Sequence, residues 1–424
     1  MRRLKYAVEG CFNGVWGDEA NGVDDLAVVR VADFNRERSR VELGDDPTVR
    51  AIPLSARNRR VLVQGDLLME KSGGGELQPV GNVVSFDDER PSVCSNFVAR
   101  MPVAQDCESR FVAYVFRSLY EQGKNIPHIK QTSGIQNLDS ESYLNELAWL
   151  PERETQLRIA NFLDEKTARI DALIVGKEEL VARLAEFRKS IISEAITKGL
   201  SKTSPTKASG LNWLGEIPAG WKLTPLKHLG EAIIGLTYSP ENVTTEGHGD
   251  LVLRSSNVQQ GRIVLEDNVF VNSKIPERLR TKVGDILICS RNGSRALIGK
   301  NAMIQEEHVD HTFGAFMTIF RGPYNNYIRW ALNSPLFDFH AASFLTSTIN
   351  QLTTGNLNSL VIPFPPATER ERIDAHLSLR TEQLEQVRAH AVEHIARLRE
   401  YRSSLISAAV TGQINIENYN NLNA

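Results

Sequence analysis

One long segment of this chain occurs twice. Residues 158–197 return at 372–411 without a gap, because the paired positions differ throughout by 214 (372 minus 158). This long segment follows, each time, a compact stretch with mixed helix and strand patterns. The sequence therefore predicts two equivalent functional parts in one chain. The identical pairs include Arg158/Arg372, Ile159/Ile373, Leu163/Leu377, Thr167/Thr381, Glu186/Glu400, Arg188/Arg402, Ala195/Ala409 and Thr197/Thr411.

Both copies have the apolar periodicity of long amphipathic helices with a heptad seam, since steps of three, four or seven separate the apolar residues. About forty helical residues form a rod of roughly 60 Å. Such a rod is unstable alone, because helical stability comes mostly from packing one face, so each rod is predicted to pack on the other. The expected seam is Ile159, Leu163, Ile170, Leu173, Leu180, Leu184, Phe187 and Ile191 in the first copy, and Ile373, Leu377, Leu384, Val387, Leu398, Tyr401 and Leu405 in the second.

Composition limits the class of protein. A chain of 424 residues has room for two or three domains, and 41% hydrophobic content is ordinary for a soluble globular protein. No apolar run is long enough for a membrane span, and no signal core follows the basic residues 1–5. Cys11, Cys94, Cys107 and Cys289 lack Cys-x-x-Cys spacing, which indicates reduced thiols in a cytoplasmic protein. A net charge of −3 argues against non-specific coating of nucleic acid.

Prolines before each rod, glycines after it and a polar linker divide the chain. The expected fold class is α+β, with two α/β globules, two long helices and an internal repeat with pseudo-twofold symmetry. The expected parts are a first globule (1–150), a first rod (151–200), a linker and docking segment (201–221), a second globule (222–362), a second rod (363–412) and a flexible tail (413–424).

The globules correspond more faintly than the rods. Gly65-Asp66-Leu67-Leu68 matches Gly284-Asp285-Ile286-Leu287, and residues 133–138 are paired with residues 354–358. Short β-like runs fill both globules, and one helix is expected in each, over 110–122 and 327–341. The sequence therefore predicts globule, rod, globule, rod.

This layout resembles the specificity subunit of type I restriction–modification systems over nearly the whole chain. The motifs that carry the resemblance are the two Gly-Asp segments, the Gly-containing motifs at 133–138 and 354–358, the Pro-led segments at 151–156 and 365–370, and the stretch from Trp213 to Trp221. The first globule begins almost at Met1 and has no counterpart of this last stretch.

The resemblance implies that each globule is a target-recognition domain that reads one half of a split sequence in double-stranded DNA. It implies that the two rods pack antiparallel as a spacer and that the chain is non-catalytic. The implied partners are two modification (methyltransferase) subunits and two restriction (helicase-nuclease) subunits, without a membrane. No cofactor is expected on this chain, because S-adenosylmethionine, ATP and Mg belong to the partner subunits, and the implied location is the cytoplasm.

Sequence readout needs side chains that make paired hydrogen bonds with base edges, and small or Gly-rich loops that approach phosphates. Three parts of each globule fit: the end of an early strand, the loop after the Gly-Asp motif, and the Gly-containing motif near the end. The candidate DNA-binding residues are Arg30, Asn35, Lys71, Ser72, Gly73, Gln131, Ser133 and Gln136 in the first globule, and Arg254, Ser255, Asn257, Arg291, Asn292, Ser294, Arg295, Thr353, Thr354 and Asn356 in the second.

Other interpretations stay open for these residues. Arg-Asn-Gly-Ser is also an ordinary turn, and a single arginine such as Arg254 serves equally well in a structural ion pair. His390 and His394 have helical spacing without a third metal ligand, so no metal site is expected.

No catalytic motif is found. Asp66, Glu70 and Lys71 suggest a nuclease site only superficially, because the lysine is adjacent to Glu70 and the arrangement is not repeated in the second globule. A fused nuclease-specificity chain is therefore disfavoured. The alternative function from another class is a coiled-coil adaptor whose globules bind proteins.

Overall fold

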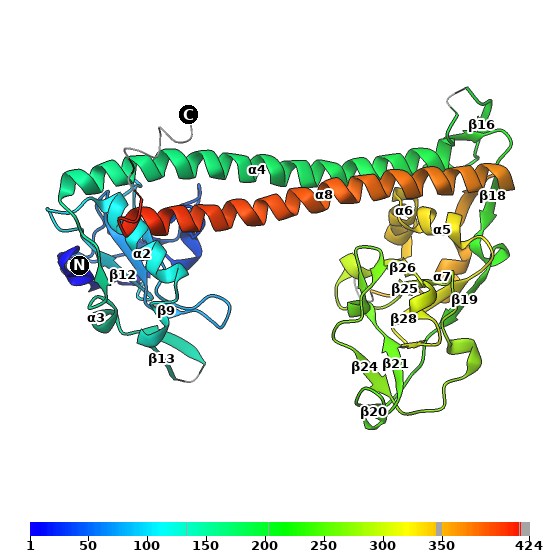
Figure 1. The fold of residues 1–424 in the computed structure, drawn as a ribbon, viewed down its shortest axis with the longest axis horizontal. Coiled ribbons are helices and arrows are strands. Elements are labelled where there is room, and N and C mark those ends of the chain that lie inside the picture. Colours follow the sequence, from blue (N-terminus) through cyan, green and yellow to red (C-terminus); the bar gives the residue numbers. More distant parts are fainter. Residues whose placement is uncertain (133, 202, 345–349, 415, 417–424) are drawn as a thin grey trace. The chain divides into compact units, whose positions relative to one another are not determined.

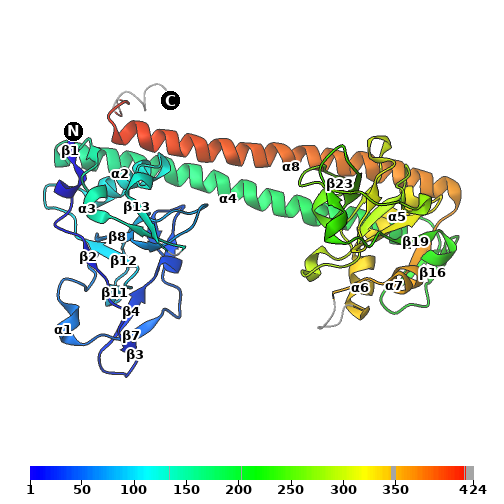
Figure 2. The same cartoon turned by 90° about the horizontal axis from the view of Figure 1, so that it is seen from below.

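The computed structural model describes residues 1–132, 134–201, 203–344, 350–414 and 416. The chain forms two compact units, residues 1–178 with 393–424 and residues 179–392. Two long helices, α4 (Arg153–Lys198) and α8 (Ala367–Val410), contribute to both units and lie side by side (Figures 1 and 2). The first unit holds the start of α4 and the end of α8, so the helices run antiparallel. The predicted pair of long helices is confirmed.

The first unit is built on two sheets with strand orders β2-β12-β8-β10-β6-β5 and β11-β4-β7-β3. A smaller sheet has the order β13-β14-β9, and β1 pairs with β15. Its strands are β1 (Arg2–Arg3), β2 (Phe12–Asn13), β3 (Asp18–Glu19), β4 (Asp25–Val29), β5 (Phe34–Asn35), β6 (Arg40–Val41), β7 (Val49–Ala51), β8 (Leu67–Glu70), β9 (Ser72–Gly73), β10 (Val83–Ser85), β11 (Ser92–Cys94), β12 (Val98–Met101), β13 (Ile129–Thr132), β14 (Ile135–Leu138) and β15 (Leu147–Ala148); its short helices are α1 (Leu54–Arg57), α2 (Ser109–Glu121) and α3 (Ser140–Tyr143).

The second unit has sheets of order β19-β28-β25-β26 and β27-β21-β24-β20. Three two-stranded pairs, β16–β17, β18–β29 and β22–β23, complete it. Its strands are β16 (Thr206–Ala208), β17 (Glu216–Pro218), β18 (Lys222–Pro225), β19 (Glu231–Ile234), β20 (Val243–Thr244), β21 (Asp250–Leu253), β22 (Val258–Gln259), β23 (Arg262–Ile263), β24 (Val269–Val271), β25 (Ile286–Cys289), β26 (Asn301–Met303), β27 (Thr312–Phe313), β28 (Met317–Arg321) and β29 (Val361–Phe364); its helices are α5 (Asn325–Leu332), α6 (Pro335–Phe344) and α7 (Thr354–Ser359).

The two units repeat one topology. The order β2-β12-β8-β10 of the first unit is that of β19-β28-β25-β26, and β11-β4-β7-β3 is that of β27-β21-β24-β20. The last two residues of each Gly-Asp motif begin the matching strand, β8 or β25. The aspartate of each motif is buried in an ion pair with an arginine of the neighbouring strand in the sheet, β12 or β28. These pairs are Asp66–Arg100 (2.6 Å) and Asp285–Arg321 (2.6 Å). The internal repeat expected from the sequence is confirmed.

One pairing made from the sequence is wrong. The pairing of residues 133–138 with 354–358 fails for the described residues of the first segment, because Ile135–Leu138 form β14 and Thr354–Ser359 form α7. The true counterparts are the helix caps: Asp139 accepts a hydrogen bond from Ser142 N, and Thr353 accepts one from Asn356 N. These positions again differ by 214 (353 minus 139), so the register of the long repeat continues back into the globules.

The second expected helix of the globules is also corrected. Residues 327–341 were expected to form one helix, and the structure has two, with α5 ending at Leu332 and α6 starting at Pro335. Proline has no N–H to donate and its ring clashes with the preceding turn, so it starts a helix rather than continuing one. The first expected helix, 110–122, corresponds to α2 at Ser109–Glu121.

Only part of the expected heptad seam is buried. Ile159, Leu163, Ile170, Ile373, Leu377 and Leu405 are buried, whereas Leu173, Leu180, Phe187, Val387 and Tyr401 are exposed. Leu184, Ile191, Leu384 and Leu398 are intermediate. The reason is that each helix end packs against its globule as well as against the other helix, which places Ile174, Ile192, Ile196, Ile395 and Ile406 in the core.

Trp221 fixes the docking segment to the second unit. Its ring is buried among Ile192, Ile196 and Leu377, and its Nε1 donates a hydrogen bond to Glu369 at 2.8 Å. The segment therefore joins the start of α8 to the end of α4. Trp221 is thus a packing anchor.

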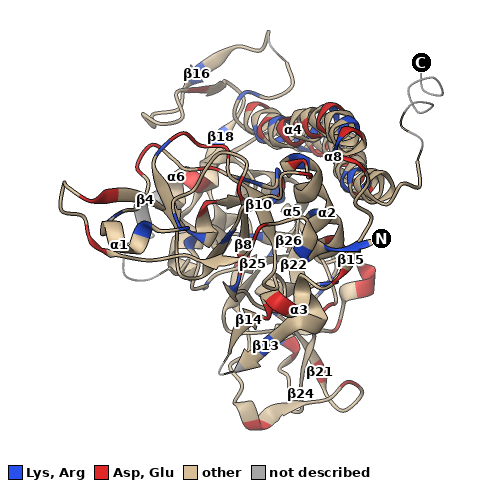
Figure 3. Ribbon diagram, turned by 90° about the vertical axis from the view of Figure 1, so that its left-hand side faces the viewer, with Lys and Arg blue, Asp and Glu red and all other residues tan. Residues whose placement is uncertain are grey.

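Basic and acidic residues both occur along the two long helices, as the blue and red segments of the ribbon in Figure 3 show. Exposed ion pairs within α4 and α8, such as Arg169–Glu165 and Arg397–Glu393, are typical of a solvated helix surface. Within the described ranges, none of the helices combines the length and the apolar character that crossing a membrane requires.

We expect Arg321→Ala to lower the free energy of unfolding by about 3–5 kcal/mol, because it leaves the buried carboxylate of Asp285 without its counter-ion. Arg278→Ala is the matched control, since its pair with Glu231 is exposed and contributes about 1 kcal/mol or less. Urea unfolding of both variants measures the difference. Equal, small losses would contradict a structural role for the buried pair.

Candidate nucleic-acid interface

The loop after β8 starts from a buried carboxylate. Glu70 is the last residue of β8, and its Oε2 lies 2.7 Å from the guanidinium of Arg36. Burial raises the pKa of Glu70, and the charge of Arg36 opposes that rise. Because Asp66 is paired with Arg100, the two carboxylates do not form an open pair that could hold a metal. In the part of the chain that the structure describes, no group of three or more His, Cys, Asp or Glu is arranged for metal binding.

The residues directly after β8 include a short strand, β9. Lys71 Nζ donates to Asn13 Oδ1 at 2.7 Å, and Ser72 Oγ donates to Asn137 Oδ1 at 2.6 Å. Ser72 and Gly73 form β9, which pairs with β14. Two of the three predicted parts of the first recognition surface are thus adjacent.

The β13–β14 hairpin holds the remaining candidates of the first unit. Gln131 is exposed on β13. Gln136 is buried and accepts a hydrogen bond from Val80 N at 3.2 Å, so it supports the loop rather than facing solvent. Contact of Gln136 with DNA stays a prediction. Ser133 lies outside the described residues.

In the second unit the equivalent loop follows β25. Arg291 is exposed, and its guanidinium carbon lies 5.1 Å from the ring centroid of Phe316. Asn292 Nδ2 donates to Ser255 Oγ at 3.3 Å, which brings together two candidates from different strand ends. Ser294 donates its backbone N–H to Asn292 Oδ1 at 2.9 Å, and both Ser294 and Arg295 are exposed.

The two early-strand arginines are held by carboxylates. Arg30 follows β4 and pairs with Asp33 at 3.0 Å, an interaction that raises the pKa of Arg30. Arg254 follows β21 and pairs with Asp267 at 2.9 Å. Of the two interpretations left open by the sequence, the structure shows the ion pair for both residues.

The asparagines near these arginines are also engaged. Asn35 donates to Glu42 at 2.9 Å. Asn257 is fully buried, where its side chain accepts from Arg254 N and donates to Val264 O and Glu266 O. Asn257 is thus a structural cap inside the protein, and its contact with DNA stays a prediction.

Thr353, Thr354 and Asn356 form the start of α7. Thr353 Oγ1 accepts a hydrogen bond from Asn356 N at 3.1 Å and is hydrogen-bonded to Asn356 Oδ1. These side chains cap the helix, which is a structural function typical of threonine at this position. Leu352 N donates to Ser290 O at 2.7 Å, so the start of α7 lies close in space to the loop that carries Arg291.

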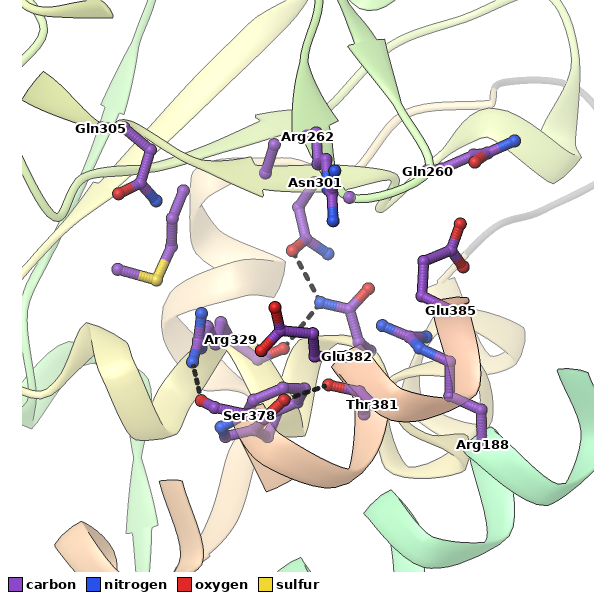
Figure 4. A pocket seen from close by; sticks show the side chains of 15 residues that line it. Arg188, Gln260, Arg262, Asn301, Gln305, Arg329, Ser378, Thr381, Glu382 and Glu385 are labelled. Carbon is purple, nitrogen blue, oxygen red and sulfur yellow. Dashed lines mark hydrogen bonds between the residues drawn. The ribbon is translucent and has the colours of Figure 1, made fainter. Parts of the chain in front are cut away.

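A polar pocket of about 300 Å³ lies in the second unit (Figure 4). Arg188 of α4 and Glu385 of α8 border it, and they occupy the positions that Arg402 and Asp171 occupy in the first unit. Arg402 and Asp171 form an ion pair. In the second unit Glu385 is instead bound by Arg388 at 2.6 Å, and burial lowers the pKa of Arg188. The pocket therefore carries both signs of charge.

Sequence reasoning missed the aromatic residues of these surfaces. Phe97 and Phe316 are exposed beside the two loops, and Arg50 lies 4.7 Å from the ring of Trp16. Phe97 and Phe316 differ in number by 219 (316 minus 97), as do Gly65 and Gly284. Extending the register of the Gly-Asp motifs along the chain would have paired the two phenylalanines.

Two curated proteins match part of this chain. The EcoKI type I restriction enzyme specificity subunit of Escherichia coli (strain K12) is 26% identical over 207 residues, which are 47% of this chain and 44% of that protein. The StySPI specificity subunit of Salmonella potsdam is 27% identical over 212 residues, with the same coverage. The chain resembles type I specificity subunits. The matched region is less than half of the length of each relative, and no family model matches.

Solved structures share the fold over nearly the whole chain. A chain from a structural study of complex assembly and conformational transition of the type I R-M system has a TM-score of 0.71 at 16% identity, covering 97% of both chains. The HsdS subunit from Thermoanaerobacter tengcongensis has a TM-score of 0.51 at 15% identity, covering 97% of this chain and 96% of its own. The expected fold, two mixed α/β globules with two long helices, is that of the specificity subunits.

We expect Asn257→Ala to lower the free energy of unfolding by about 2–3 kcal/mol, because buried backbone groups lose their hydrogen-bond partner. Asn292→Ala should cost about 1 kcal/mol or less, since Asn292 is partly exposed. Chemical denaturation tests both. Unchanged stability of the Asn257 variant would mean that the residue is free for another function.

Proposed function

We propose that this chain is the DNA sequence-specificity subunit of a type I restriction–modification complex. The observation that carries the proposal is the repetition of one framework with different side chains on its loops. After the matching strands, Lys71 and Ser72 of the first unit correspond to Ser290 and Arg291 of the second, where Ser290 is buried and Arg291 is exposed. Two readers with one framework and different surfaces suit a target with two unlike halves.

The proposed target is a bipartite, gapped and asymmetric sequence in double-stranded DNA, with one half-site for each recognition unit. Exposed Arg and Lys side chains suit guanine edges and phosphates, and Asn or Gln suits adenine edges. In the second unit, Arg291 is our first candidate for a base contact. The structure shows no hydrogen bond or ion pair for its guanidinium among the described residues, so no such interaction has to break before the guanidinium binds DNA.

The proposed subunit performs no chemistry of its own. Two modification subunits and two restriction subunits would supply methylation and cleavage, with S-adenosylmethionine, ATP and Mg bound to those partners. The internal repeat supports two copies of each partner, because the same type of surface occurs twice. Exposed Leu173, Leu180 and Phe187 on α4 offer apolar contacts for such partners. We place the complex in the cytoplasm, where its DNA is found.

The proposal is tested by selecting DNA with the intact complex. The full chain, copurified with its modification subunits, is incubated with a library of duplexes containing random positions, and the bound fraction is sequenced. We expect two short half-sites separated by an unspecified gap. Replacing residues 1–150 with the corresponding segment of a related specificity subunit should change one half-site and leave the other.

Arg291→Ala should relax one position of one half-site, because a bidentate arginine contact discriminates its base by about 1–3 kcal/mol. Binding without any sequence preference would contradict the proposal. It would favour the alternative, an adaptor whose globules bind proteins.

A further inference from the structure

Each unit carries a phenylalanine with its ring in solvent on a matching turn. Phe97 lies between β11 and β12 and is 49% exposed, and Phe316 lies between β27 and β28 and is 59% exposed. Single exposed apolar side chains are ordinary on soluble proteins. The informative observation is that the exposed ring recurs at the same place in two units whose other loop residues differ.

Both turns are fastened to the neighbouring loop in the same way. The carbonyl oxygen of Phe97 accepts hydrogen bonds from two successive backbone N–H groups, those of Lys71 at 2.8 Å and Ser72 at 3.2 Å. The carbonyl oxygen of Phe316 does the same with Ser290 at 2.9 Å and Arg291 at 3.0 Å. Each ring is therefore anchored beside the residues proposed to read DNA.

A glycine packs closely behind each turn. A Cβ atom on Gly14 would lie 2.1 Å from the carbonyl oxygen of Cys94, and one on Gly235 would lie 2.2 Å from that of Gly314. No side chain fits at either position, because the backbones approach too closely. The turns are thus held against the sheet while the phenylalanine rings stay outside.

The surroundings of both rings suit a polyanion with flat bases. In the second unit Arg291 lies over the Phe316 ring. In the first unit a pocket of about 320 Å³ lies beside Phe97, with Trp16 and Arg30 also lining it. Basic groups beside apolar surface match double-stranded DNA, which offers phosphates next to sugars, base edges and thymine methyl groups.

We propose that Phe97 and Phe316 make apolar, sequence-independent contacts with the bases or sugars of bound DNA. Each ring anchors its unit on one half-site, and the differing neighbours select the base: Lys71 and Ser72 in the first unit, and the exposed Arg291 in the second. The inference rests on the proposed DNA-recognition function and adds a division of labour to it. The shared residue supplies affinity and the residues that differ supply specificity.

The test measures the affinity of the full chain with its modification subunits for the duplex that the wild type selects. Phe97→Ala and Phe316→Ala should each weaken binding about tenfold, as expected for the loss of an aromatic contact with a base. The selected sequence should stay the same. The dependence of affinity on salt should also stay the same, because no charge is removed.

Val63→Ala and Val283→Ala are matched controls. These valines are 58% and 59% exposed, and they precede the Gly-Asp motifs at the opposite ends of β8 and β25 from the phenylalanines. Both control variants should bind DNA within about twofold of the wild type, since an exposed side chain away from the contact adds little. Phenylalanine variants that bind as tightly as these controls would overturn the inference.

A second pair of variants separates an apolar contact from an effect on folding. Phe316→Leu keeps an apolar group at the turn, and Phe316→Asn replaces it with a polar one. Tighter DNA binding by the Leu variant supports the inference, and equal affinities overturn it. If the wild type itself selects no sequence, the proposed function fails; if it selects one and the phenylalanine variants match the valine controls, only this inference fails.

Discussion

The pairing of α4 with α8 is the interaction on which the rest of the structure depends. The helices have 46 and 44 residues, and helices of this length need a partner for their apolar face. Because they run antiparallel, the first unit uses the start of α4 and the end of α8, and the second uses the opposite ends. Neither compact unit is complete without helical residues from the other half of the sequence. The ion pair of Asp171 with Arg402 joins such distant residues within the first unit.

Each globule is tied to its own part of the helices by an equivalent contact. Tyr114 of α2 donates to Asp164 of α4 at 2.8 Å, and Trp330 of α5 donates to Asp374 of α8 at 2.8 Å. Hydrogen bonds of this kind hold the sheets, and with them the loops after β8 and β25, against the helices. The framework is thus shared by both units, and the side chains on the loops are free to differ. In our account this separation lets one fold read two unlike half-sites.

Much of the architecture could be predicted from the sequence because the repeat is long and ungapped. A constant register of 214 residues and helical periodicity identify α4 and α8 without structural information. The side chains that face the core could not be assigned in the same way, since helix ends pack on globules as well as on each other. Leu173 and Phe187 are exposed for this reason, and Ile174 and Ile192 are buried. The residue type of Asn257 also could not show that its side-chain amide forms hydrogen bonds inside the protein.

The most direct test of the central claim is the spacing of the two half-sites. Seven residues inserted into each long helix, between 178 and 179 and between 392 and 393, add about two turns and about 10 Å while nearly preserving the facing sides. If the helices set the spacing, both half-sites stay the same and the gap between them grows by about three base pairs of 3.4 Å each. An unchanged gap, with both half-sites still selected, would contradict the account.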